Sequence, residues 1–101
     1  MEKPRIRHTV AFTLVHPKDS AAARGFLDEG ERILRAIPGV ERFEALRQVS
    51  PKNDYDFVFS MEFADRPAYD RYSAHPMHGD FVARRWVTEV VRFLENDMEA
   101  L

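Results

Sequence analysis

Apolar and polar residues alternate along two segments of the chain, and this alternation predicts two β-strands. The first segment covers residues 6–14, where one face carries Ile6, Val10, Phe12 and Leu14. His8 falls on the same apolar face as these four residues. The second segment covers residues 55–63 and alternates most clearly, with one face formed by Tyr55, Phe57, Phe59, Met61 and Phe63.

Two further strands are predicted from weaker signals. Residues 40–49 alternate imperfectly, and the turn-forming residues 50–54 after them predict a hairpin with the strand at 55–63. Residues 87–94 are rich in valine, which favours a last strand, and residues 95–101 are expected to form a polar tail.

Two regions of the chain are predicted to be helical. In the first, Asp19 or Ser20 can cap the start and Pro38-Gly39 ends the helix, whose apolar stripe is formed by Ala23, Phe26, Leu27, Gly30, Ile33, Leu34 and Ile37. In the second, Asp65 caps a helix with Pro67 in its first turn. Pro76 disfavours the α conformation at His75, so this helix is predicted to stop there and a short helix to follow over 77–86.

The order of these elements, β-α-β-β-α(α)-β, is that of an α+β ferredoxin-like (βαββαβ) protomer with both helices on one face of an antiparallel sheet. The other face carries apolar and mixed side chains, which a small protein rarely leaves in water. We therefore expect a homodimer in which two sheets stack around a two-fold axis. The helix break at His75-Pro76 is expected to open onto the interior between the two sheets.

The composition argues against several classes of partner and site but does not indicate a particular function. The chain has 101 residues, a formal net charge of -2 and no cysteine. These values predict one domain and argue against a nucleic-acid partner, a disulfide framework and a zinc–thiolate site. No apolar run approaches the ~20 residues of a membrane-spanning helix and no secretory signal is recognised, so we expect a cytoplasmic protein without a membrane partner.

The candidate chemistry gathers at the helix break. Tyr72, His75 and His78 are expected to cluster there, because a break between two helices can aim polar side chains into a cavity. Trp86 can wall such a cavity, although aromatic residues at these spacings also suit an ordinary core. The structural alternative is that Tyr72 packs in the core and the histidines cap helices or lie at the surface.

Several short motifs follow one another in a characteristic order, namely His8-Thr9-Val10-Ala11-Phe12, Ile37-Pro38-Gly39-Val40, Asp54-Tyr55, Tyr72-Ser73-Ala74-His75-Pro76-Met77-His78 and Asp97. Together they resemble the stress-responsive A/B barrel (Dabb) domain family over nearly the whole chain. The resemblance implies a single Dabb domain over residues 1–101 that forms a dimeric α/β barrel from ferredoxin-like protomers. Most members of this family have no assigned reaction.

The best-understood enzyme of this type is the plant olivetolic acid cyclase, a cofactor-free polyketide cyclase. The resemblance to it implies a catalytic histidine at His78, a helper tyrosine at Tyr72 and a first-strand histidine at His8. The aspartate near the end is usually followed by an aromatic residue in the family, whereas here Met98 follows Asp97.

Three functions remain open on these observations. We predict a homodimer that binds a small apolar or aromatic molecule in the barrel cavity, with His75 and Trp86 as ligand contacts. Binding is favoured because it requires less of the site residues than catalysis does. The alternative is a cofactor-free acid/base enzyme, with His78 as base, Tyr72 as oxyanion donor and His8 beside them, for polyketide-cyclase-like aldol closure or proton abstraction. A transition-metal site at His8, His75 and His78 is the third, but His-X-X-His across a proline does not match a helical metal motif, so we expect no metal and no cofactor.

Overall fold

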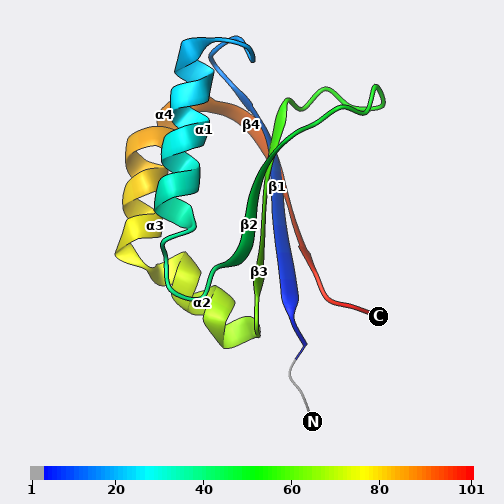
Figure 1. Ribbon diagram of the computed structural model, residues 1–101, viewed down its shortest axis with the longest axis vertical. Coiled ribbons are helices and arrows are strands. Elements are labelled where there is room, and N and C mark those ends of the chain that lie inside the picture. The colour runs from blue at the N-terminus through cyan, green and yellow to red at the C-terminus, as the bar shows by residue number, and fades with distance from the viewer. Residues whose placement is uncertain (1–3) are drawn as a thin grey trace.

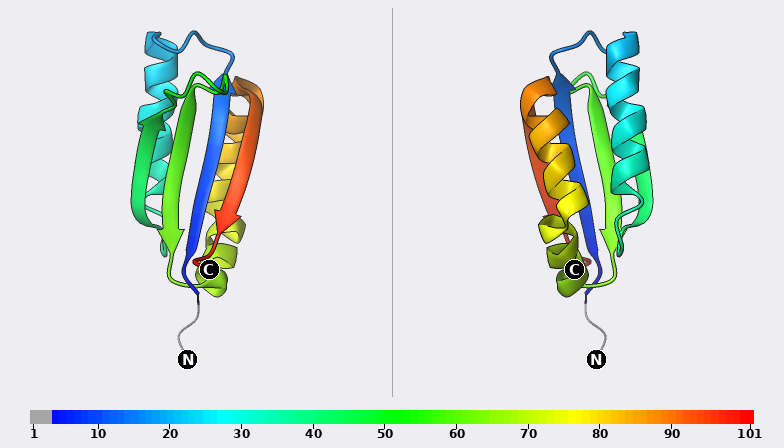
Figure 2. Two further views of the ribbon diagram at one scale, coloured as in Figure 1. Left: turned by 90° about the vertical axis from the view of Figure 1, so that its right-hand side faces the viewer. Right: turned by 90° about the vertical axis from the view of Figure 1, so that its left-hand side faces the viewer.

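A computed structural model describes residues 4–101 and shows one antiparallel sheet with the helices packed on a single face (Figure 1). The four strands lie in the order β2-β3-β1-β4, and they are β1 (Ile6–Leu14), β2 (Glu41–Arg47), β3 (Phe57–Phe63) and β4 (Val90–Met98). The two views onto opposite faces of the sheet show that its second face carries no helix (Figure 2). The ferredoxin-like α+β fold predicted from the sequence is therefore confirmed.

The first helix, α1 (Ala21–Leu34), starts where the sequence predicted and ends three residues before Ile37, the last residue of its predicted apolar stripe. Ser20 is the N-cap residue, and its Oγ accepts a hydrogen bond from the Ala23 backbone N–H at 3.1 Å. The helix ends at Leu34, and the chain turns through Pro38-Gly39, where Gly39 has a φ of 93° that glycine adopts without steric penalty.

The hairpin of β2 and β3 is confirmed, and the structure explains the weak alternation of its first strand. Between Glu41 and Glu44 the register with β3 shifts, and Arg42 takes a φ of 51°. A β-bulge of this kind inserts an extra residue and moves the following side chains to the opposite faces. A regular period of two therefore cannot run through the whole strand.

The helix break at His75 lies where the sequence predicted it. Helix α2 (Arg66–Ala74) begins at Asp65, whose carboxylate accepts from the Ala68 N–H at 2.9 Å. His75 has a ψ of 137°, and its Nδ1 accepts from the Met77 N–H at 3.0 Å, which caps the next helix, α3 (Pro76–Phe81).

The predicted limits of the last helix and strand are wrong by several residues. Helical backbone continues from α3 through a π-helical turn, η1 (Val82–Trp86), into α4 (Val87–Glu89), so the first residues of the predicted last strand are helical. The strand β4 then runs on to Met98, through most of the predicted polar tail. Tertiary pairing overrides local propensity here, because residues 92–98 form a continuous ladder with β1.

A charged network ties this long helical segment to the rest of the protomer. Arg85 in η1 donates from Nη1 to Glu29 of α1 at 3.0 Å and from Nε to Glu89 of α4 at 2.6 Å. His16, in the loop after β1, contacts the same Glu89 carboxylate at 2.7 Å. The hydrogen bond from Arg85 is the main cause that lowers the pKa of Glu89. Within residues 4–101, no helix is long and apolar enough to cross a membrane.

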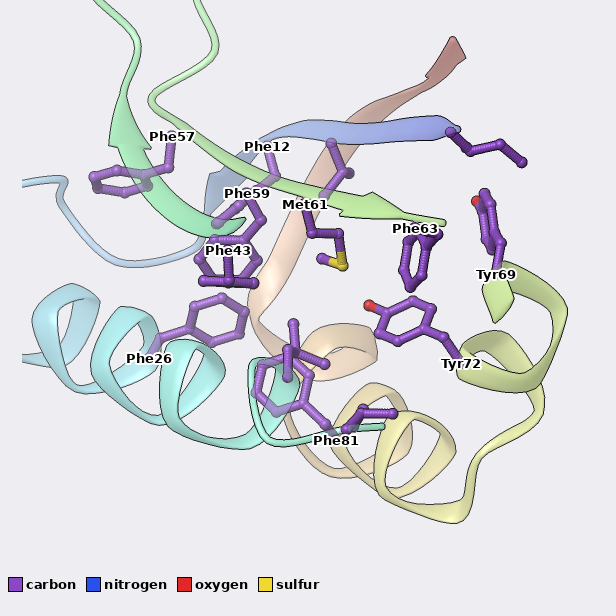
Figure 3. Packing of buried hydrophobic residues seen from close by; sticks show 14 of the residues in the cluster. Phe12, Phe26, Phe43, Phe57, Phe59, Met61, Phe63, Tyr69, Tyr72 and Phe81 are labelled. Carbon is purple, nitrogen blue, oxygen red and sulfur yellow. The ribbon is translucent and has the colours of Figure 1, made fainter. Parts of the chain in front are cut away.

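Phenylalanine rings fill the space between the sheet and α1 (Figure 3). The ring of Phe59 lies 4.8 Å from that of Phe12 and 5.3 Å from that of Phe43, measured between centroids. Gly30 of α1 faces this layer, and a Cβ added there would lie 2.9 Å from the Phe59 ring. The absence of a side chain at Gly30 therefore lets α1 approach the sheet closely.

We predict that Gly30→Ala lowers the free energy of unfolding by up to about 2 kcal/mol, because overpacking costs ~1–3 kcal/mol and the better helix propensity of alanine offsets ~1 kcal/mol. The fully buried Phe59 ring has neighbours on its other sides and cannot move away cheaply. Urea denaturation followed by circular dichroism measures the effect. Gly25→Ala is the matched control in the same helix, where an added Cβ meets nothing within 4 Å, and it is expected to stabilise the protein.

Candidate functional site

A cavity of about 330 Å³ lies between the sheet and the helical segment that follows the break. Its inner walls are apolar and come from both layers, with Val10, Phe59 and Met61 on the strands and Leu34 and Phe81 on the helices. The apolar lining is completed by Val82, Trp86, Val87 and Phe93. Val87 and Phe93 are more than half exposed, so this side of the cavity opens to solvent.

The structure brings four of the five predicted site residues to this cavity. His8, Tyr72, His78 and Trp86 all line it. The ring centroids of Tyr72 and His78 are 4.7 Å apart, and those of His8 and Tyr72 are 6.3 Å apart. His75 is not among the lining residues, because its ring turns back to cap α3.

The predicted position of the cavity in the assembly is wrong. We expected the helix break to open onto the interior between two stacked sheets, which is the barrel cavity of the dimer. The cavity instead lies within one protomer, between its sheet and its helices. The physical reason is the period of two along a strand, because His8, Val10 and Met61 all point to the face that the helices cover.

A hydrogen-bonded group behind His8 was not predicted. Oδ1 of the Asp97 carboxylate lies 2.6 Å from Nδ1 of His8. Oδ2 of the same carboxylate accepts a hydrogen bond from the Tyr69 hydroxyl at 2.9 Å. The Tyr69 oxygen also lies 3.1 Å from Nδ1 of His8. A carboxylate can only accept, so a neutral His8 that donates from Nδ1 keeps its lone pair on Nε2.

Part of this arrangement was visible in the sequence. Tyr69 and Tyr72 are three residues apart and share a helix face, and Asp97 belongs to the family motifs. The missing information was the register of the last strand, which places Asp97 directly opposite His8. Because the predicted last strand stopped at residue 94, no pattern in the sequence brought this aspartate to the site.

The protein environment keeps the side chains of Tyr69, Tyr72 and His78 uncharged at neutral pH. Burial is the main cause that raises the pKa of both tyrosines, Tyr72 and Tyr69, so both hydroxyls stay protonated. Burial also lowers the pKa of His78, with the Ser73 backbone acting in the opposite direction. His78 is therefore neutral and can accept a proton, whereas the tyrosine hydroxyls can donate hydrogen bonds.

The hydroxyl of Tyr72 is available to a ligand. In the described part of the chain this hydroxyl makes no hydrogen bond. It is not fully buried either, because the one fully buried side-chain polar atom without a partner in that part is the Thr13 hydroxyl. The Tyr72 oxygen therefore opens onto the cavity. Tyr69 differs, because its hydroxyl is already engaged by Asp97.

The geometry does not assemble the metal site considered as the third possibility. Among residues 4–101, no group of three or more histidine, aspartate or glutamate side chains is placed to hold a metal ion. His75 is the histidine that fails to join the set, since its ring nitrogen caps a helix outside the cavity.

Solved structures with this fold include one that is similar throughout in sequence as well. A Dabb family protein with a ferredoxin-like fold from Mesorhizobium loti is 56% identical, with a TM-score of 0.96 over 98% of this chain and 99% of that one. A dimeric ferredoxin-like protein of unknown function from Thermobifida fusca is 15% identical, with a TM-score of 0.76 over 97% and 92% of the two chains. The hydroxynitrile lyase of Passiflora edulis is 11% identical, with a TM-score of 0.77 over 96% and 94%.

A comparison with curated protein sequences finds no match. The two distant structures share the fold alone with this chain, whereas the Mesorhizobium protein also shares most of its sequence. The family model for the stress responsive A/B barrel domain matches residues 6–100. The resemblance read from the motifs is thus confirmed, and the chain belongs to the stress-responsive A/B barrel (Dabb) family.

Proposed function

We propose that the protein is a homodimer in which each protomer binds a small apolar or aromatic molecule in the cavity between its sheet and its helices. The observation that carries this proposal is the cavity itself, which has a volume of about 330 Å³. Pockets for small molecules have volumes of roughly 300–1,000 Å³, with mainly apolar walls and a few polar groups that orient the ligand. Here the apolar walls meet a polar end formed by His8, Tyr72 and His78.

A bulky residue at the mouth of the cavity should weaken binding without disturbing the fold. Val87 lines the cavity and is 68% exposed, so Val87→Trp narrows the opening where the fold has room for the larger side chain. We expect naphthalene-type compounds to raise the melting temperature of the wild type by ligand linkage and to do so much less in the variant. Differential scanning fluorimetry measures both shifts.

Val49→Trp is the matched control, because Val49 is 82% exposed and lies in the hairpin loop away from the cavity. This variant should respond to ligands as the wild type does. Equal responses of the wild type and both variants would place the ligand outside the cavity and contradict the proposal.

The sheet face without helices supports the dimer. One register row crosses all four strands on this face and consists of Leu46, Val58, Ala11 and Leu94. Leu46 is 43% exposed and Leu94 is 51% exposed in the single protomer. A continuous apolar row that is half-buried at Val58 and Ala11 and exposed at both ends suits an isologous contact with a second copy, and the Thermobifida fusca protein of this fold is described as dimeric.

Leu94→Asp should convert the dimer into a monomer. In a two-fold contact each substitution appears twice, so two carboxylates would be buried close to the apolar row. Size-exclusion chromatography with light scattering at micromolar concentration should report a dimer for the wild type and a monomer for the variant. Val49→Asp, which adds the same charge in the hairpin loop, should remain a dimer, and a monomeric wild type would refute this part of the proposal.

A cofactor-free acid/base enzyme is the second candidate, and one observation favours it. A neutral imidazole, His78, and a protonated hydroxyl, Tyr72, face the same apolar cavity with their ring centroids 4.7 Å apart. In this reading His78 removes a proton from a carbon next to a carbonyl, and Tyr72 donates a hydrogen bond to the enolate oxygen that forms. His8, held by Asp97, positions the substrate, and the reaction is an aldol-type closure of a polyketide-like chain.

If the protein catalyses this step, His78→Ala should lower kcat/KM by roughly 100-fold, the smaller effect found for a general base. The wild-type rate should fall as pH decreases through the pKa of His78, because only the neutral imidazole accepts a proton, and burial places that pKa below its ordinary value of ~6.5. Product analysis by mass spectrometry after incubation with polyketide-like substrates provides the measurement.

His75→Asn is the control for a histidine outside the cavity, since asparagine can still cap α3. It should leave kcat/KM unchanged. A substrate that is turned over equally well by the wild type and by His78→Ala would exclude the role given to His78 while leaving ligand binding intact.

A further inference from the structure

Glu95 is the one side chain with a formal charge at neutral pH among the described residues that line the cavity. It lies on β4, directly opposite Val10 of β1, and alternation along the strand places it on the same face as Phe93 and Asp97. Neither the catalytic motif of the family nor the site predicted from the sequence includes it. A carboxylate in an otherwise apolar cavity therefore needs its own explanation.

The Glu95 carboxylate is left without a protein partner. In the part of the chain that the structure describes, it makes no hydrogen bond or ion pair, whereas Glu29, Glu62 and Glu89 all contact arginines. Its residue is exposed, so the carboxylate stays hydrated at the mouth of the cavity. A group of this kind is available to a ligand that enters from solvent.

The charge of Glu95 acts on the polar end of the cavity. Burial is the main cause that raises the pKa of Tyr72, and Glu95 adds to the rise. Glu95 also acts to raise the pKa of His78, against the larger lowering by burial. The carboxylate is therefore close enough for its field to reach the groups that would contact a ligand.

The surroundings do not compensate this negative charge. Lysine and arginine are absent from the described lining, and Asp97 adds a second carboxylate behind His8. Arg66 stacks on the ring of Tyr69 at 5.3 Å from its centroid and does not line the cavity. An anionic ligand would thus meet a carboxylate and no lining side chain that carries a positive charge.

We propose that Glu95 selects the ligand by charge, so that the cavity takes apolar or aromatic molecules with a protonated amine and discriminates against carboxylates. This inference rests on the proposed ligand-binding function and adds the chemical class of the ligand. The aromatic part lies between the apolar walls at Phe59, Met61 and Phe81, and the ammonium group donates hydrogen bonds to the Glu95 carboxylate at the mouth.

Three probes with one ring system and different charges test the inference. They are 2-naphthylmethylamine, which is protonated at neutral pH, the neutral 2-naphthalenemethanol, and 2-naphthoate. By isothermal titration calorimetry the amine should bind the wild type about twofold to fivefold more tightly than the alcohol, as expected for an ion pair that remains partly hydrated. The carboxylate should bind more weakly than the alcohol.

Glu95→Gln should remove the advantage of the amine and leave the affinity for the alcohol unchanged. Glu95→Lys should reverse the order, so that 2-naphthoate binds best. Glu99→Gln is the matched control, because it removes the same charge four residues along the chain, outside the cavity lining, and it should preserve the wild-type order. Since Glu95 is exposed and unbonded, all three variants should keep the wild-type melting temperature.

The possible results separate this inference from the proposal on which it rests. If the three probes bind the wild type equally well, or if Glu95→Gln keeps the preference for the amine, the charge selection is refuted and ligand binding stands. If none of the three probes binds, the ligand-binding function itself fails, and this inference fails with it.

Discussion

The pairing of the first strand with the last is the constraint on which the candidate site depends. β1 lies inside the sheet and β4 at its edge, and their antiparallel register sets Asp97 opposite His8, Glu95 opposite Val10, and Phe93 opposite Phe12. Residues separated by nearly the whole chain thereby share one cavity. A shift of this register by one residue would turn Asp97 and Glu95 to the other face of the sheet and leave His8 without its partner.

The cavity exists because the two layers are not equally filled. Next to α1 the layers close tightly, since Gly30 allows the helix to approach the Phe59 ring. Beyond the helix break, Phe81 is the one buried residue from Pro76 to Glu89, whereas α1 buries four, and a cavity lined by Phe81 and Met61 remains. The break at His75 therefore has two effects. It changes the direction of the chain, and it brings Tyr72 and His78 to the polar end of the cavity.

The polar groups divide into two sets with different surroundings. Asp97 and Tyr69 are hydrogen-bonded to each other and to His8, which holds the imidazole in one orientation. Tyr72 and His78 line the cavity, and the hydroxyl of Tyr72 has no partner in the described chain. In a medium of low dielectric, donors and acceptors of the second set interact strongly with whatever enters. The first set supports the site, and the second meets the ligand.

Much of this molecule could be predicted from local patterns. Alternation, helical spacing and the Asp65 and Pro76 signals identified β1, β3, α1 and the helix break, because each of these depends on residues close together in the sequence. The ordered family motifs also placed His8, Tyr72 and His78 together in one predicted site. The largest errors in the limits of the elements lie at the C-terminal end, where α4 and β4 depend on contacts with β1 and α1 that no local pattern encodes.

The sequence by itself thus determined which residues of β1 and β3 share one face of the sheet and where the helix breaks, since the period of a strand and the place of a helix break are local properties. Only the tertiary structure decided that the cavity lies within a protomer, that Asp97 and Tyr69 hold His8, and that Glu95 reaches the same space. The physical reason is that strand register is set by pairing between distant segments. Which carboxylate meets which histidine is therefore known only once the whole sheet has formed.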